Sequence, residues 1–392
     1  MATSGAVAVF INTMTGSETL VGLAISLQVL CMLVGQIIYA PFVHSVRNLP
    51  MKMFYRMGVQ RLLPFVMSIP LFLGAGPHFA VGAFMIVFGL FWLIDGVITM
   101  LWGELTARAI RPELRGHMMG MQVVIGGGIS LLTGLLLTWL LATPLLTDNY
   151  RFGYVFVLSA ALFFPSIMFI RLVKDPKPIL APKKPDFKKY YSQIPRLIRE
   201  SKPLQLALIA RMPSYIGFSV ITFMIVFGSN ELEITEAQIS WLVYTQIAGV
   251  LLGGVIVGET SRRFGNKSVI MICNIGVLVT ILMALILMVL PGLGYFWLIA
   301  LCIFASVWSN NWIGYMNYVL DISPEELRPA YQLVVNCVGI PFSLVGFGIG
   351  ALIDTWGYAV AFILGGITTI IAIIASTRLL SRKQIRTLDL ET

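Results

Sequence analysis

The chain has 392 residues, of which 58% are hydrophobic and only 11% are charged, and its mean hydropathy is +0.88. These values lie far outside the usage of soluble globular proteins. They exclude that class and predict an all-α protein that crosses a lipid bilayer many times.

The predicted membrane spans follow one another along the whole chain. A helix needs about 20 apolar residues to cross roughly 30 Å of hydrocarbon. Residues 2–15 are apolar, but as a helix they would reach only about 21 Å, which is half a span. Full spans are predicted near residues 18–43, 58–74, 79–107, 117–143, 151–172, 205–229, 236–258, 268–290, 295–320, 329–353 and 357–380.

The net charge of +9 is explained by the placement of the basic residues. Of the 27 Lys and Arg, 25 lie on alternate connections, and Arg151 and Arg211 are the exceptions. The positive-inside rule places these connections and the C-terminus in the cytoplasm, so no nucleic-acid partner is predicted. The acidic loop 229–236 falls on the opposite side. The basic connections are residues 47–61, 108–115, 171–202, 262–267, Arg328 and the tail from Arg378.

The two halves of the chain repeat each other. Glu18 superposes on Glu236 and Gln28 on Gln246 at an offset of 218. We therefore predict twelve helices in two parallel six-helix halves, an arrangement typical of transporters with a substrate site between the halves. The offset maps Met1 well inside the seventh span, so about fourteen residues of a first helix are predicted to be missing. The predicted parts are residues 1–172, a linker 173–204, residues 205–380 and a tail 381–392.

The linker 173–204 is rich in Lys and Pro. This composition favours a solvated cytoplasmic linker over a regulatory or partner site, and part of it can lie on anionic headgroups.

One loop carries a recognisable motif. The segment "GETSRRFGNK" (258–267) resembles the Gly-x-x-x-Asp-Arg-x-Gly-Arg/Lys-Arg/Lys signature of the major facilitator superfamily. Gly258, Arg263, Gly265 and Lys267 match, whereas Arg262 stands where that family usually has Asp. The equivalent loop 40–52 is more degenerate. "PELRG" (112–116), with its echo at 324–329, is a second similar element.

The resemblance implies a cytoplasmic gate at these loops. Glycine lets helices approach closely, and basic side chains can bind helix-end carbonyls or acids across the gate. The alternative is that the charges only fix topology. Glu104 is expected to pair with Arg108 at i+4 or with the gate. The expected gate residues are Glu104, Arg115, Gly258, Arg263, Gly265, Lys267 and Arg328.

A carboxylate interrupts the span 79–107. Trp92, Asp95, Thr99 and Trp102 are spaced to share one helix face. Trp308, Asn311, Tyr315 and Tyr318 repeat the spacing in the second half. The resemblance implies that both faces line a central cavity, and an intramembrane Asp usually faces water, a partner or a ligand. The alternatives are that Asp95 is a structural tie and that the aromatic residues pack between helices.

A second charge lies in the seventh span, where Arg211 precedes Pro213 and Tyr215. Arg211 is about two turns from the cytoplasmic end of the span, so it can snorkel to the interface. It can instead face the cavity with Tyr215 and bind an anionic substrate or Asp95. The sequence leaves both possibilities open.

These features predict a secondary active transporter of a small solute, working by alternating access, with proton coupling through Asp95. A facilitative uniporter and a non-transporting membrane sensor are the alternatives. The four cysteines lack metal-like spacing and the three histidines sit at span ends, so no metal, cofactor or enzyme activity is predicted. We expect a monomer in a bacterial cytoplasmic membrane.

Overall fold

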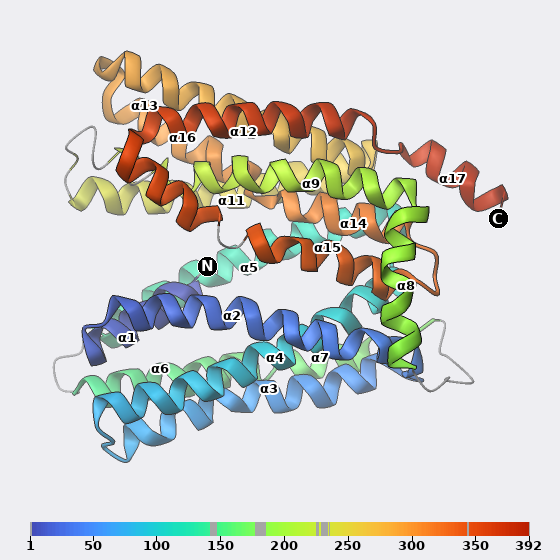
Figure 1. Cartoon of the computed structure of the whole chain (residues 1–392). Coiled ribbons are helices and arrows are strands. Elements are labelled where there is room, and N and C mark those ends of the chain that lie inside the picture. The colour runs from blue at the N-terminus through green and yellow to red at the C-terminus, as the bar shows by residue number, and fades with distance from the viewer. Residues whose placement is uncertain are drawn as a thin grey trace. The chain divides into compact units, whose positions relative to one another are not determined.

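The computed structural model describes residues 2–141, 147–176, 186–224, 227–228, 234, 236–342 and 345–391. Within these ranges every regular element is a helix, as predicted, and the chain forms two compact units (Figure 1). The first unit contains residues 1–109 and 129–191, and the second contains residues 110–128 and 192–392. The unit boundary therefore differs from the predicted boundary near 172, because the first half of one helix, residues 110–128, lies with the second unit.

The first unit is built from helices that follow the predicted spans. Asn48 starts one of them, because its side chain accepts a hydrogen bond from the backbone N–H of Met51 at 3.0 Å. The helices are α1 (Ala2–Thr15), α2 (Glu18–Tyr39), the 3₁₀ helix η1 (Ala40–Ser45), α3 (Leu49–Phe72), α4 (Pro77–Ala109), α6 (Asp148–Phe163), α7 (Ser166–Leu172) and the distal part of α5 (Pro112–Leu141).

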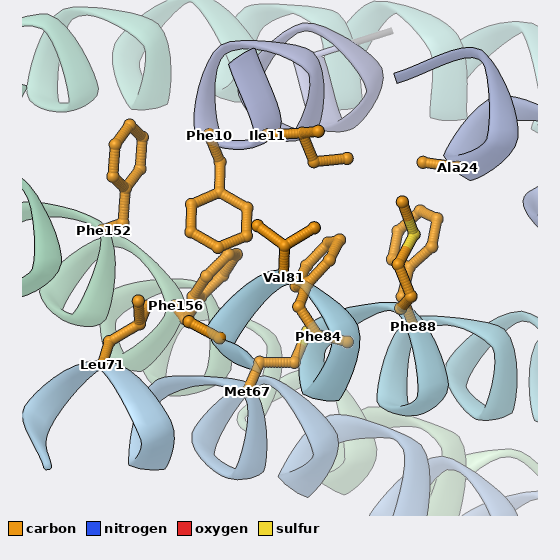
Figure 2. Close-up of a cluster of buried hydrophobic side chains, with 12 residues drawn as sticks. Phe10, Ile11, Ala24, Met67, Leu71, Val81, Phe84, Phe88, Phe152 and Phe156 are labelled. Atoms are coloured by element: carbon orange, nitrogen blue, oxygen red, sulfur yellow. The ribbon is translucent and has the colours of Figure 1, made fainter. Parts of the chain in front are cut away.

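The short helix α1 is packed into the core of this unit. Phe10 is 1% exposed, and its ring makes edge contacts with Phe84 at 5.0 Å, Phe152 at 5.1 Å and Phe156 at 5.3 Å between centroids. Figure 2 shows Phe10 directed from α1 toward the rings carried by α4 and α6. Residues 2–15 are therefore an integral helix of the unit.

The second unit contains the remaining helices. Ser201 begins α9 by accepting a hydrogen bond from Leu204 N at 3.3 Å. Gly357 has φ +80 and breaks the last long helix into two. The helices are α9 (Lys202–Ile221), α11 (Glu236–Phe264), α12 (Asn266–Val289), η2 (Pro291–Leu293), α13 (Gly294–Val307), η3 (Trp308–Asn310), α14 (Asn311–Ile322), α15 (Arg328–Phe342), α16 (Val345–Thr377) and α17 (Arg382–Glu391).

Seven helices in the described ranges are long and apolar enough to cross a membrane. They coincide with predicted spans, and α3, α5, α11 and α15 occupy the positions of the others. The acidic loop 229–236 lies outside the described residues except for Ile234 and Glu236.

The linker is more structured than its composition predicted. Residues 177–185 lie outside the described residues, but α8 (Phe187–Glu200) is an amphipathic helix. In the first unit Tyr191 donates a hydrogen bond to the carbonyl of Ile37, and in the second unit Leu197 packs beside Leu204. Apolar residues at helical spacing partly bury one face of α8, while none of its residues is fully buried.

Candidate functional site

The carboxylate of Asp95 is bound by a residue of the neighbouring helix α3. Gln60 Nε2 donates to Asp95 Oδ1 at 2.8 Å and to the carbonyl of Phe91 at 3.4 Å. Gln60 is fully buried, and its Oε1 accepts a hydrogen bond from Arg61 Nη1 at 2.5 Å. Asp95 is thus linked to a cation through one amide side chain.

Arg61 extends this link to two further helices. Its Nε donates to Ser166 Oγ of α7 at 3.4 Å, and its guanidinium carbon lies 5.0 Å from the ring centroid of Phe163 on α6. Among the described residues, no carboxylate lies within ion-pair distance of Arg61. The Asp95, Gln60 and Arg61 side chains therefore connect α3, α4, α6 and α7 within the first unit.

The other residues predicted on the α4 face are half-buried. Trp92 packs against Phe88 and Phe91 with centroid distances of 6.1 and 5.6 Å. In the part of the chain that the structure describes, its Nε1–H has no hydrogen-bond partner. Thr99 and Trp102 lie farther along the same continuous helix. The predicted helical spacing is therefore retained in the first unit.

Arg211 lies between two tyrosines of the second unit. Its Nε donates to Tyr215 Oη at 3.0 Å, and its guanidinium carbon is 4.8 Å from the ring centroids of both Tyr215 and Tyr315. Within the described ranges no carboxylate lies within 4.0 Å of it. A guanidinium held against aromatic faces keeps its charge available to an anion.

A buried polar cluster contacts the hydroxyl of Tyr315. Ser214 Oγ lies 3.0 Å from Tyr315 Oη and donates to Asn274 Oδ1 at 2.9 Å. Asn274 Nδ2 donates to Ser376 Oγ at 3.2 Å, so α9, α12, α14 and α16 are connected. Sequence reasoning missed this cluster, although isolated polar residues within three apolar spans were a usable signal.

A 3₁₀ turn lies within the predicted span 295–320. The chain is helical from Pro291 to Ile322, in agreement with that span, but α13 ends at Val307 and η3 intervenes before α14. This turn alters the angular spacing between Trp308 and Tyr315 from that of a regular α-helix. Trp308 is 8% exposed and its ring fills the space beside Gly276. Trp308 Nε1 and Asn311 Oδ1 have no hydrogen-bond partner among the described residues.

One expected gate residue, Arg115, belongs to a polar network in the second unit. Arg115 forms an ion pair with Asp321 at 3.1 Å, and its Nε donates to the carbonyl of Ile110 at 3.1 Å. Asn266 Nδ2 donates to Asp321 Oδ2 at 2.6 Å, and Ser261 Oγ donates to Asn266 Oδ1 at 2.6 Å. Asp321 at the end of α14 supplies a carboxylate to a loop whose signature Asp is replaced by Arg262.

Glycines allow α5 and α11 to approach backbone to backbone beside this network. A Cβ atom on Gly120 would overlap the carbonyl of Gly254 and crowd Gly258. A Cβ atom on Gly116 would overlap the side chain of Ser261. The close approach of helices expected at Gly258 therefore occurs inside the second unit.

The remaining basic residues of the motif loop are also partnered. Glu259 accepts hydrogen bonds from Arg262 at 2.8 and 2.6 Å and one from Arg263. These bonds hold the pKa of the Glu259 carboxyl at about 2, below its usual range. Lys267 Nζ donates to the carbonyls of Thr377 and Leu379 at 2.6 and 2.7 Å, at the end of α16. Gly265, with φ +87, separates α11 from α12.

Two expected gate residues lie apart from this loop. Glu104 pairs with Arg108 at 2.8 Å in the first unit, as the i, i+4 spacing predicted, and Arg108 also lies 3.6 Å from Asp175. Arg328 is buried at the start of α15. Among the described residues, no group of three or more His, Cys, Asp or Glu could hold a metal ion.

Comparison with known protein families finds one match in the second part of the chain. Residues 207–389 match the sequence model of the Major Facilitator Superfamily. Members of this superfamily are membrane transporters that bind small-molecule substrates and work in a lipid bilayer. Among curated proteins, no sequence matches the chain.

Solved structures of transporters share the fold along almost the whole chain. FucP, a Fucose:proton symporter of E. coli, is similar in its outward conformation with TM-score 0.71 and 13% identity, over 97% of this chain and 97% of FucP. A bacterial homologue of the iron transporter ferroportin is similar with TM-score 0.68 and 11% identity, over 96% of each chain. The proton:xylose symporter XylE is similar with TM-score 0.66 and 14% identity, over 99% of this chain and 94% of XylE.

Proposed function

We propose that the chain is a secondary active transporter that moves a small solute by alternating access of two six-helix halves, residues 1–172 and 205–380. The fold shared with symporters along nearly the whole chain carries this proposal. The internal repeat at an offset of 218 residues supports the two-half organisation, with twelve helices of which the short α1 is the first. The protein acts as a monomer in a bacterial cytoplasmic membrane with its C-terminus in the cytoplasm.

Arg211 is the proposed substrate contact. Its guanidinium is stacked on Tyr215 and Tyr315 and has no described carboxylate partner, so an anionic group can bind it without first displacing an ion pair. The unpartnered polar atoms of Trp308 and Asn311 offer a donor and an acceptor in the same unit. These contacts favour a small solute that carries an anionic group and further hydrogen-bonding groups.

The gate is proposed at the network of Arg115 with Asp321, Asn266 and Ser261. It joins the start of α5 to the ends of α11 and α14 on the side that carries the basic connections. Opening requires the buried ion pair to separate, so water must reach both charges as they part. Lys267 and Gly258 fix the helices that flank the network.

Proton coupling through Asp95 is the proposed energy source. Asp95 is half-buried and accepts a hydrogen bond from Gln60, which in turn binds Arg61, an arrangement in which protonation would weaken the bond from Gln60 and loosen α3 from α4. Two of the structural neighbours are described as proton symporters, which supports this choice. Uniport is the alternative, in which Asp95 serves only as the tie between helices.

The test begins with a thermal-shift screen of the purified protein against small organic anions at two pH values. A stabilising compound is then used for uptake into proteoliposomes with and without an imposed pH gradient. Asp95→Asn should still exchange the compound but fail to accumulate it, and Arg211→Gln should lose its binding. Asp354→Asn, an exposed carboxylate on α16, is the matched control. Wild-type accumulation that ignores the pH gradient would refute proton coupling.

A further inference from the structure

A cavity of about 670 Å³ opens between the end of α2, η1 and the start of α3 in the first unit. Three basic residues line it, Arg47, Lys52 and Arg56, and all three side chains are exposed. Apolar and aromatic residues, among them Phe42 and Tyr55, form the rest of the wall. The cavity therefore combines a concentrated positive charge with an apolar lining.

Among the residues that the structure describes, the three cations have no acidic partner. In the described part of the chain none of them makes an ion pair or a side-chain hydrogen bond. No Asp or Glu occurs between Glu18 and Asp95, so nearby sequence supplies none. Three like charges around one cavity repel one another, and an anion bound in the cavity would reduce that repulsion.

The start of α3 adds to the same field. Asn48 caps the helix and lines the cavity, so the first N–H groups and the positive end of the helix dipole lie beside it. The first turn contains no acidic residue and carries Lys52, a charge that the dipole disfavours at this end. An anion in the cavity would offset both the positive end of the helix dipole and the charge of Lys52.

An exposed apolar stripe leaves the cavity along α3. It starts at the cavity residue Tyr55, which is 63% exposed, and continues at helical spacing through Val59, Leu62, Val66 and Ile69. A soluble phosphate compound would gain nothing from such a stripe. The acyl chains of a lipid can lie along it while the headgroup occupies the cavity.

We propose that this cavity binds the headgroup of an anionic phospholipid, whose phosphate contacts Arg47, Lys52 and Arg56. Basic recesses at the ends of membrane helices are suited to anionic headgroups, and each basic residue near such a surface contributes about fivefold in affinity. The site shares no residue with Asp95, Arg211 or the Arg115 network, and the proposal does not depend on the substrate or coupling ion of the transporter.

Native mass spectrometry of the purified, delipidated full chain tests the assignment. Adducts of dioleoylphosphatidylglycerol and dioleoylphosphatidylcholine are titrated in parallel. The wild type should bind the first lipid more tightly. The variant Arg47→Gln/Lys52→Gln/Arg56→Gln should lose roughly a hundredfold of that affinity and keep its weak binding of phosphatidylcholine. The control Arg111→Gln/Arg378→Gln/Lys383→Gln removes the same charge at exposed sites elsewhere and should bind as the wild type does.

Further measurements distinguish a lipid headgroup from a soluble phosphate and show whether a loss of binding comes from misfolding of the variant. If inorganic phosphate or glycerol phosphate displaces the lipid at comparable concentration, the cavity is a site for soluble phosphates and the lipid assignment is wrong. Lys52→Gln alone should lose about fivefold, and Arg47→Lys/Arg56→Lys should keep the binding because the charge remains. Equal losses in the cavity and control triple variants, or no preference for phosphatidylglycerol in the wild type, would overturn the proposal.

Discussion

The loops that follow the second helix of each half occupy matching positions in the repeat, but their charges are treated in opposite ways. In residues 258–267 every basic side chain is bound, to Glu259 or to the end of α16. In residues 40–52, Arg47 and Lys52 make no ion pair or side-chain hydrogen bond with the described residues, and both line a cavity. The difference shows that a basic residue in such a loop contributes to the folded structure only where a carboxylate or a carbonyl lies close enough to bind it.

The largest effect is expected from breaking the network that joins the second loop to its neighbours. Arg115→Leu leaves Asp321 buried beside Asn266 without its cation, which should cost about 3–5 kcal/mol of stability. Thermal unfolding of the purified protein in detergent measures this loss. Arg111→Leu removes an exposed charge one turn earlier and should change little. Equal losses in the two variants would mean that the ion pair contributes nothing specific.

A smaller effect is expected from the turn that shapes the second loop. Gly265 has φ +87 and ψ 173, a conformation that is nearly exclusive to glycine, so Gly265→Ala should cost about 1–3 kcal/mol. The first loop turns through η1 and needs no such residue. Gly58→Ala within α3, where a Cβ meets open space, is the control and should be neutral or slightly stabilising. Unchanged unfolding of Gly265→Ala would contradict the role of this turn.

The pairing of Glu259 should appear as a pH dependence. Its pKa in the folded protein is about 2, below the usual value of 4.5, because Arg262 and Arg263 bind the charged form. A lowered pKa contributes stability that is present above about pH 4.5 and is lost as the pH falls toward 2. The difference in melting temperature between wild type and Glu259→Gln should therefore shrink over that interval. A difference that stays constant with pH would rule out this contribution.

The smallest effect is expected in the first loop. Without lipid, Arg47→Gln/Lys52→Gln/Arg56→Gln should leave the melting temperature unchanged or raise it slightly, because it removes repulsion and breaks no described ion pair. The same detergent unfolding assay measures this. A clear loss of stability would show that these side chains are structural, as they are in the second loop.

The sequence predicted the helices well because apolar segments of membrane length are a strong signal. It also predicted the pair of Glu104 with Arg108, since i, i+4 contacts depend only on local geometry. It did not predict Asp321 as the partner of Arg115, because 206 residues separate them and no local rule joins them.

The details of the candidate site were harder to predict for a related reason. Gln60 and Ser214 are ordinary polar residues in the sequence, and their roles depend on which helix lies opposite. Within the predicted span a 3₁₀ turn begins at Trp308, and the periodicity of the sequence cannot detect such a local change of helix type. The amphipathic helix α8 was hidden because its basic residues dominated the composition of the linker.

The contact of Gly120 with Gly254 also constrains how this sequence can drift over evolutionary time. The two backbones touch, so neither position can accept a larger residue unless α5 and α11 first move apart. Replacing either glycine by a larger residue would cause a clash with the facing backbone, and a second replacement at the facing glycine could not remove that clash. In a saturation library selected for folded protein, both sites should retain glycine, while Gly126 and Gly128, which face open space, should tolerate many residues.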